Sequence, residues 1–239
     1  MNIDPAQILQ WISIYALPLL LSVVFHEVAH AYVAEKCGDS TARRAGRITL
    51  NPLAHIDLMG TVLLPLFLTI TNAPVKFGWA KPVPVNVFNL RKIRRDSVLV
   101  ALAGPATNLA LALVCAVAFA LIMTLMPDAV YLAYDETDPA VLRQMGAVES
   151  ILVPVTLMVN AGLQINMTLM LFNLLPILPL DGGRMLNGML PDGIAEHYEK
   201  LEPYGMLLII CIWIIPATQG AFYNAVSYST SLLYLISFY

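Results

Sequence analysis

Three apolar stretches of the chain, residues 8–36, 97–126 and 150–175, are each long enough to cross a lipid bilayer. A spanning helix needs about 20 mostly apolar residues. The whole chain is 59% hydrophobic and only 12% charged, whereas soluble domains carry about 25% charged residues. This pattern excludes an ordinary soluble protein and predicts an all-α polytopic membrane protein.

Three further apolar segments, residues 57–71, 204–216 and 222–238, are shorter. Each of the three could be short, tilted or re-entrant. If residues 57–71 cross the membrane fully, the chain must return to the cytoplasmic side between residues 72 and 91. We therefore expect about six membrane-embedded helices, in a single domain that covers residues 1–239.

The distribution of charge bears on topology and on partners. Lys and Arg concentrate in residues 36–51 and 76–95, whereas residues 127–149 are mainly acidic. The excess of cations in cytoplasmic loops places the first two regions on the cytoplasmic side of a multi-pass protein in the cell membrane. A net charge of −3 indicates no nucleic-acid partner. The three cysteines form no Cys-x-x-Cys pair, so a thiolate metal site is not expected.

The first long apolar stretch contains His26-Glu27-Val28-Ala29-His30. Two histidines four residues apart lie on one face of a helix, which suits two ligands of a single Zn²⁺. Glu27 between them is then placed to act as the general base on a metal-bound water. Ionisable residues at membrane depth are costly and mark functional sites. The alternative is a buried histidine pair whose hydrogen bonds are satisfied without metal.

A catalytic zinc normally takes three protein ligands. The metzincin pattern would place a third histidine six residues after His30, where this chain has Lys36. Asp181 is the better candidate, because Pro176 and Pro179 end the preceding apolar segment and the topology puts Asp181 at the depth of the two histidines. The alternative role for Asp181 is a helix N-cap. The other histidines, which we expect to be structural or solvent-facing, are His55 and His197.

Residues 77–87 form a different kind of segment. Pro82 and Pro84 flank Val83 and favour an extended backbone. We expect a short membrane-associated β-hairpin or extended segment, whose edge could bind a peptide by strand addition. Val83 and Val85 would then contact the substrate. The alternative is an interfacial loop anchored by Trp79.

Three blocks of the sequence together resemble the site-2 protease family of intramembrane zinc metalloproteases. They are the His-Glu-Val-Ala-His motif, Ala-Gly-Pro-Ala-Thr-Asn at residues 103–108, and the run of residues 173–182 that ends in Leu-Asp-Gly. The resemblance implies that His26, His30 and Asp181 bind one Zn²⁺ and that Glu27 activates a water molecule. It also implies that Asn173 holds the scissile carbonyl or its oxyanion, and more weakly that Asn108 positions the substrate.

The function implied by this resemblance is cleavage of transmembrane or membrane-proximal segments of other membrane proteins. The partners are then a membrane-protein substrate and the lipid bilayer, with the active site toward the cytoplasmic side. The short loops leave no room for a PDZ or CBS domain and resemble prokaryotic members. Two alternatives are a membrane zinc transporter, which would not need Glu27 as a base, and a proteolytically idle factor that binds membrane proteins.

Overall fold

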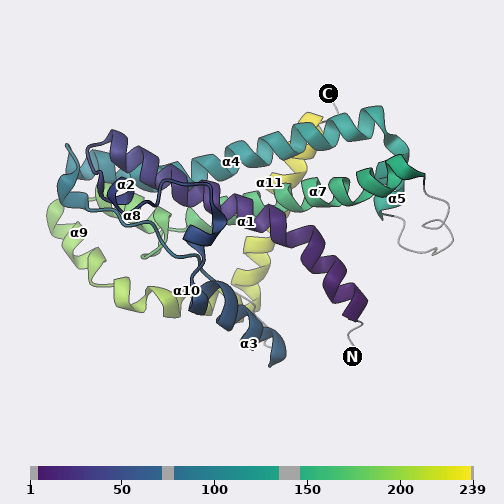
Figure 1. Ribbon diagram of the computed structural model, residues 1–239. Helices are drawn as coiled ribbons and strands as arrows, with labels where there is room; N and C mark the ends of the chain where they lie inside the picture. Colours follow the sequence, from purple (N-terminus) through teal and green to yellow (C-terminus); the bar gives the residue numbers. More distant parts are fainter. Residues whose placement is uncertain (1–4, 72–77, 135–145, 238–239) are drawn as a thin grey trace. The chain divides into compact units, whose positions relative to one another are not determined.

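The structure is a computed structural model that describes residues 5–71, 78–134 and 146–237 (Figure 1). Helices and short helical turns account for all regular secondary structure within these ranges. The elements are α1 (Pro5–Lys36), α2 (Thr41–Arg44), η1 (Pro52–His55), η2 (Leu58–Leu63), α3 (Leu64–Ile70), η3 (Val87–Asn89), α4 (Ile93–Leu125), α5 (Pro127–Tyr134), α7 (Ala147–Asn173), α8 (Asp181–Met189), α9 (Asp192–Glu199), η4 (Glu202–Tyr204), α10 (Gly205–Ile214) and α11 (Pro216–Ser237).

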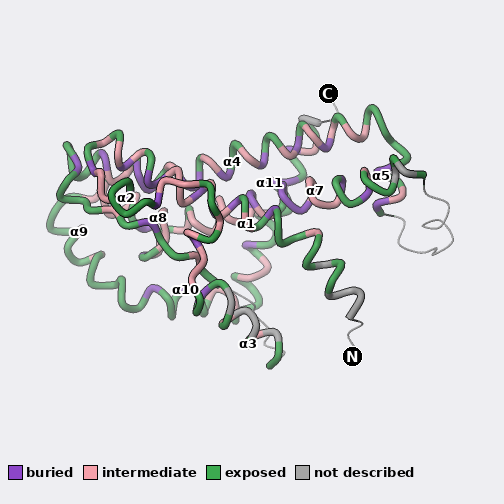
Figure 2. The backbone as a smooth tube through the Cα atoms, viewed as in Figure 1, coloured by how far each residue is buried: buried purple, intermediate pink, exposed green. Residues whose placement is uncertain are grey.

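Three helices have the length and composition of membrane spans: α1, α4 and α7. Many of their residues are exposed (green in Figure 2), among them the apolar Leu17 and Leu21 of α1 and Val117 of α4. Large apolar groups on the outside of a helix are stable when lipid surrounds them. The three long apolar stretches are therefore confirmed as helices that are long and apolar enough to cross a membrane.

Of the six predicted membrane-embedded helices, six full spans are not supported. The described residues contain three candidate spans, or up to four if the bent pair formed by residues 192–214 and 216–235 is one broken span. The two parts of that pair meet at 84°. At about 1.5 Å per residue, η2 and α3 together are too short for a hydrocarbon core of about 30 Å.

The predicted β-hairpin is also not found, because no strand occurs in the part of the chain that the structure describes. Residues 78–86 run as an extended chain without regular structure, which agrees with the other form of that prediction. Phe77 lies outside the described residues. The two prolines explain the absence of strand pairing, since Pro82 and Pro84 have no backbone N–H to donate.

The chain divides into two compact units. The first consists of residues 1–22, 109–168 and 226–239, and the second of residues 23–108 and 169–225. In the first unit, the ring of Phe119 packs edge-on against Tyr234, and the Tyr234 hydroxyl donates a hydrogen bond to Asn160. The second unit contains every residue for which the sequence predicts a role in the site.

Within the second unit, the extended segment of residues 78–86 packs on the C-terminal half of α1. Val83 is buried in a small cluster with Ala31 and Ala42. Val85 packs against a second cluster that includes Ala34 and Leu90. Alanines on this face of α1 leave room for the segment to come close to the helix. The close packing therefore brings the backbone of the segment next to the His-Glu-Val-Ala-His motif.

Candidate metal centre

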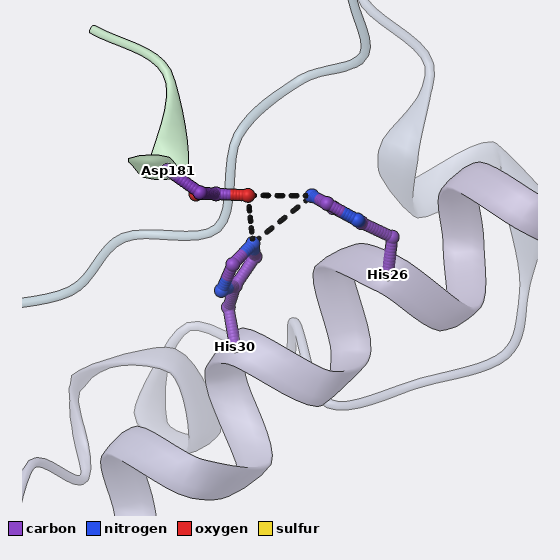
Figure 3. A group of neighbouring side chains, drawn as sticks. All are labelled: His26, His30 and Asp181. Atoms are coloured by element: carbon purple, nitrogen blue, oxygen red, sulfur yellow. Dashed lines mark hydrogen bonds and ion pairs between the residues drawn. The ribbon is translucent and has the colours of Figure 1, made fainter. Parts of the chain in front are cut away.

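The two histidines of α1 lie one helical turn apart, and their rings converge on one point (Figure 3). The Nε2 atoms of His26 and His30 are 3.0 Å apart, and their ring centroids are 4.6 Å apart. Both residues are buried, with exposed fractions of 7% and 9%. The helical spacing predicted this convergence on one face.

The other ring nitrogens are held by groups from α4. His26 Nδ1 lies 2.6 Å from Asn108 Oδ1, and His30 Nδ1 lies 2.7 Å from the carbonyl oxygen of Val100. Both partners are acceptors, so each Nδ1–H donates and each neutral ring carries its lone pair on Nε2. This tautomer leaves both Nε2 atoms able to bind a metal. Metal-binding histidines are commonly oriented in this way, by a hydrogen bond from the ring nitrogen that does not bind the metal.

Asp181 reaches the histidines from the first residue of α8. Its Oδ2 lies 3.2 Å from His26 Nε2 and 3.3 Å from His30 Nε2 (Figure 3). The chain can fold back here because two glycines follow. A Cβ on Gly182 would lie 2.3 Å from the carbonyl oxygen of Leu174, and one on Gly183 would lie 2.5 Å from the backbone of Ile177.

The three converging atoms fit a divalent metal. Two imidazole lone pairs and one carboxylate oxygen face one another, and Asp181 Oδ2 is buried without a hydrogen-bond partner. Three acceptors at this separation repel one another unless a cation or extra protons lie between them. Two histidines and one carboxylate are a ligand set of catalytic zinc sites, which keep a further position open. The residues present therefore suit Zn²⁺.

The charge of Asp181 is consistent with a ligand role. Burial by itself raises the pKa of this carboxyl group, but protonated rings of His26 and His30 would donate to it, outweigh burial and lower the pKa to about 2, and a bound cation would take the place of those protons. Asp181 is therefore ionised throughout the neutral range and needs no proton loss before it binds a cation.

Glu27 lies beside this cluster but does not join it. Its Oε2 accepts a hydrogen bond of 2.9 Å from the backbone N–H of Val83 in the extended segment. Glu27, the two histidines and Asp181 line one cavity of about 1060 Å³. The candidate base and the candidate ligands thus share a space that can receive a substrate.

The remaining predicted site residues fall into two groups. Asn173, Val83 and Val85 line the same cavity. The Asn173 amide donates one hydrogen bond to the carbonyl of Leu169, one turn earlier in α7. Asn108, in contrast, is fully buried and contacts His26. Its place in the structure therefore differs from the predicted substrate contact and suits orientation of a ligand instead.

The two other histidines lie outside the metal cluster. His55 Nε2 contacts the carbonyl of Thr49, and the exposed His197 contacts the carbonyl of Gly193. Both expectations about these residues fit the structure.

Gly104 is a functional position that the sequence analysis did not single out. A Cβ at Gly104 would lie 2.4 Å from both His26 Cε1 and His30 Nε2. A glycine at this point of α4 lets the helix pass directly against the two rings. Its place in the Ala-Gly-Pro-Ala-Thr-Asn block was the available signal, together with the cost of glycine inside a helix.

Comparison with known proteins decides the family. A model of "Peptidase family M50" matches residues 14–214. The chain belongs to this family. It is 37% identical over 198 residues to "Putative zinc metalloprotease YwhC" of Bacillus subtilis, covering 83% of this chain and 78% of the relative. It is 24% identical over 230 residues to "Putative zinc metalloprotease Rip2" of Mycolicibacterium smegmatis, covering 93% and 76% of the two chains.

A third relative, the Mycobacterium tuberculosis protein of the same name, is 26% identical over 211 residues, covering 87% of this chain and 69% of the relative. No solved structure matches the chain. Membership of family M50 confirms the resemblance to site-2 proteases that the three sequence blocks indicated.

Proposed function

We propose that His26, His30 and Asp181 hold one Zn²⁺ in this chain and that Glu27 is the general base of an intramembrane endopeptidase. The chain is a zinc metalloprotease by its family and by its relatives, and its three apolar helices make it a membrane protein. The observation that carries the assignment of residues is the approach of Asp181 Oδ2 to both Nε2 atoms at 3.2 and 3.3 Å.

Bound Zn²⁺ supplies Lewis-acid activation of a water molecule and of the scissile carbonyl. Glu27 takes the proton of the attacking water and delivers it to the amine that leaves. The hydrogen bond from the Val83 N–H to Oε2 fixes the orientation of this carboxylate and leaves its other oxygen for the proton. Asn108 and the Val100 carbonyl keep both histidines in the tautomer that binds metal.

Asn173 is the proposed stabiliser of the oxyanion. Its Nδ2 carries two hydrogens, and the bond to Leu169 uses one of them. The second hydrogen is available to a substrate oxygen in the cavity that Asn173 lines. Val83 and Val85 are proposed to contact the substrate beside it.

The substrate is a segment of another membrane protein, and it must unwind before cleavage. A helix in lipid satisfies its own backbone groups, so its peptide bonds are not accessible. We propose that the unwound stretch enters the cavity along residues 78–86. The cationic regions at residues 36–51 and 91–95 favour a cytoplasmic location for the site in a bacterial cell membrane. The family match runs through both compact units, which supports a single protease domain.

The experiment compares the wild type with Glu27→Gln. Gln keeps an oxygen that can accept the Val83 hydrogen bond but cannot take a proton at neutral pH. We expect cleavage of a detergent-solubilised membrane-protein substrate to fall by about 10²–10⁴-fold, with the zinc content by elemental analysis unchanged.

Near-normal turnover by Glu27→Gln would remove this mechanism. Zinc flux into proteoliposomes gives an independent measure of the transporter alternative, for which the family match provides no support. Fragments of membrane proteins that accumulate in cells with the wild type but not with Glu27→Gln would identify substrates.

A further inference from the structure

A basic surface lies where two membrane spans begin and end. We define it by five exposed side chains: Lys36, Arg44, Arg91, Lys92 and Arg95. Lys36 is the last residue of α1. Arg91 and Lys92 lie just before α4, and Arg95 lies in its first turn. The ends of membrane spans are at the depth of lipid headgroups.

The cations of the basic surface are not neutralised by the acids around them. The described structure contains no ion pair that involves any of the five. The neighbouring acids have other partners: Glu35 pairs with Arg43, Asp192 pairs with Arg94, and Asp39 and Asp96 are buried and accept hydrogen bonds. The surface therefore has an excess of positive charge.

The backbone that presents the basic surface is held in place. Arg91 N–H donates to the carbonyl of Cys37 at 3.0 Å, which fixes the start of α4 against the end of α1. Asn89 Nδ2 donates to the Asp39 carboxylate at 2.8 Å, and Lys92 N–H donates to Asp96 at 2.9 Å. The Lys36 ammonium lies over the ring of Tyr32, 5.2 Å from its centroid, and the other four cationic side chains are exposed and can reach a ligand.

An exposed aromatic side chain stands beside these cations. Phe88, in η3, is 83% exposed. Most of the Phe88 ring would contact water if this face were not covered. Aromatic and apolar groups next to Lys and Arg are typical of segments that lie in the membrane interface.

We propose that the basic surface binds the phosphate groups of anionic phospholipids, with Phe88 inserted at the boundary of the acyl chains. The position at two span ends and the exposed ring favour a lipid over an acidic protein, because a soluble partner would not account for both. The bound lipid would also hold η3, which continues the extended segment whose Val83 amide reaches Glu27. The proposal concerns binding and does not depend on the proposed protease mechanism.

The test uses the full-length, zinc-loaded protein in nanodiscs of mixed phosphatidylglycerol and phosphatidylcholine. Native mass spectrometry counts the lipids of each kind that stay bound. We compare the triple variant Arg91→Gln, Lys92→Gln, Arg95→Gln with the control Lys200→Gln, an exposed lysine outside the surface. We expect the preference for phosphatidylglycerol to fall by at least about fivefold in the triple variant and to be unchanged in the control.

Phe88→Ser separates the apolar contact of Phe88 with the acyl chains from the binding of phosphate groups by the cations. It should reduce retention of both lipids and leave the preference between them unchanged, because it removes apolar contact but no charge. Thermal unfolding of each variant shows that the fold is retained, as expected for exposed side chains.

Three results would overturn the proposal. The first is an undiminished preference for phosphatidylglycerol in the triple variant. The second is displacement of the bound lipid by inorganic phosphate at a concentration equal to that of the lipid, which would make this a site for free anions. The third is binding of poly-glutamate, lost in the triple variant, without any preference for phosphatidylglycerol.

Discussion

Asn108 shows how a single residue outside the cavity can govern metal binding. It is fully buried, and its Oδ1 lies 2.6 Å from His26 Nδ1. We predict that Asn108→Ala lowers zinc affinity by about 10–100-fold, the usual effect of removing a partner that orients a ligand. Zinc titration with a competing chelator measures this.

Asn108→Asp is the matched control, because a carboxylate also accepts a hydrogen bond from His26 Nδ1. We expect it to retain most of the zinc affinity. If both substitutions weaken zinc binding equally while the melting temperature is unchanged, the hydrogen bond to His26 is not the cause.

Asp181 carries the second prediction at the scale of single residues. Asp181→Asn replaces an anionic ligand with a neutral amide, so zinc occupancy should fall together with activity. We expect the loss of zinc affinity to be at least about 100-fold, which exceeds the effect of removing an orienting partner. Asp192→Asn is the control, since its carboxylate is exposed and pairs with Arg94. Zinc retention by Asp181→Asn would show that another group completes the ligand set.

The sequence predicted the residues of the metal cluster better than the residues that support it. His26 and His30 follow from helical spacing, and Asp181 follows from the break after α7 combined with topology. The contacts of the histidines with Val100 and Asn108 span 70 and 82 residues. Spacing along one helix carries no information about such contacts. A polar Asn108 inside an apolar span was a signal of an internal partner, but not of which partner.

At the scale of elements, the approach of α4 to α1 depends on Gly104. An added methyl group would lie 2.4 Å from both histidine rings and would displace them. We predict that Gly104→Ala loses zinc and activity together. Gly220→Ala in α11 is the control, because nothing lies within 4 Å of its added Cβ. Elemental analysis of the two purified variants tests the prediction, and wild-type zinc content in Gly104→Ala would contradict it.

The extended segment carries the second prediction at this scale. Proline at either Val83 or Val85 should disturb substrate binding and raise KM, with zinc unchanged. Val83→Pro should in addition lower kcat, because it removes the N–H that holds Glu27. Steady-state kinetics on one substrate separate the two variants. If kcat falls in Val85→Pro but not in Val83→Pro, the Val83 hydrogen bond does not position the base.

Elements with a strong apolar signal were predicted correctly, and elements set by tertiary contacts were not. The spans α1, α4 and α7 follow from long apolar runs alone. The sequence predicted that residues 78–86 are extended, but it did not predict which residues they contact. Trp79 N–H and Lys81 N–H donate to the carbonyls of Gly60 and His55, and Arg47 donates to the carbonyl of Lys81. These loop contacts replace the strand pairing of a hairpin and have no pattern in the sequence.

At the scale of the whole molecule, Asp39 is a buried carboxylate that joins three parts of the chain. It accepts hydrogen bonds from Thr41 N at 3.0 Å, Asn86 N at 2.7 Å and Asn89 Nδ2 at 2.8 Å. It therefore connects the residues after α1 with α2 and with the end of the extended segment. Loss of this group should loosen the second unit without removing a zinc ligand.

The protonation of Asp39 predicts how stability depends on pH. Burial raises the pKa of this carboxyl group, but the hydrogen bonds from Asn89, Thr41 and Asn86 outweigh burial and lower the pKa below 3.8. The folded protein then binds this proton less tightly than the unfolded chain does. The stabilisation is complete above the unfolded pKa and is lost as the pH falls through the folded pKa.

We therefore predict that Asp39→Asn lowers the melting temperature at pH 7 and that the difference from the wild type shrinks as the medium is acidified below 3.8. Both proteins release zinc when their histidines are protonated, so this effect cancels in the difference between them. Thermal unfolding in detergent over a series of pH values measures it. A difference in melting temperature that stays constant down to the lowest pH would show that the Asp39 carboxylate does not contribute through its charge.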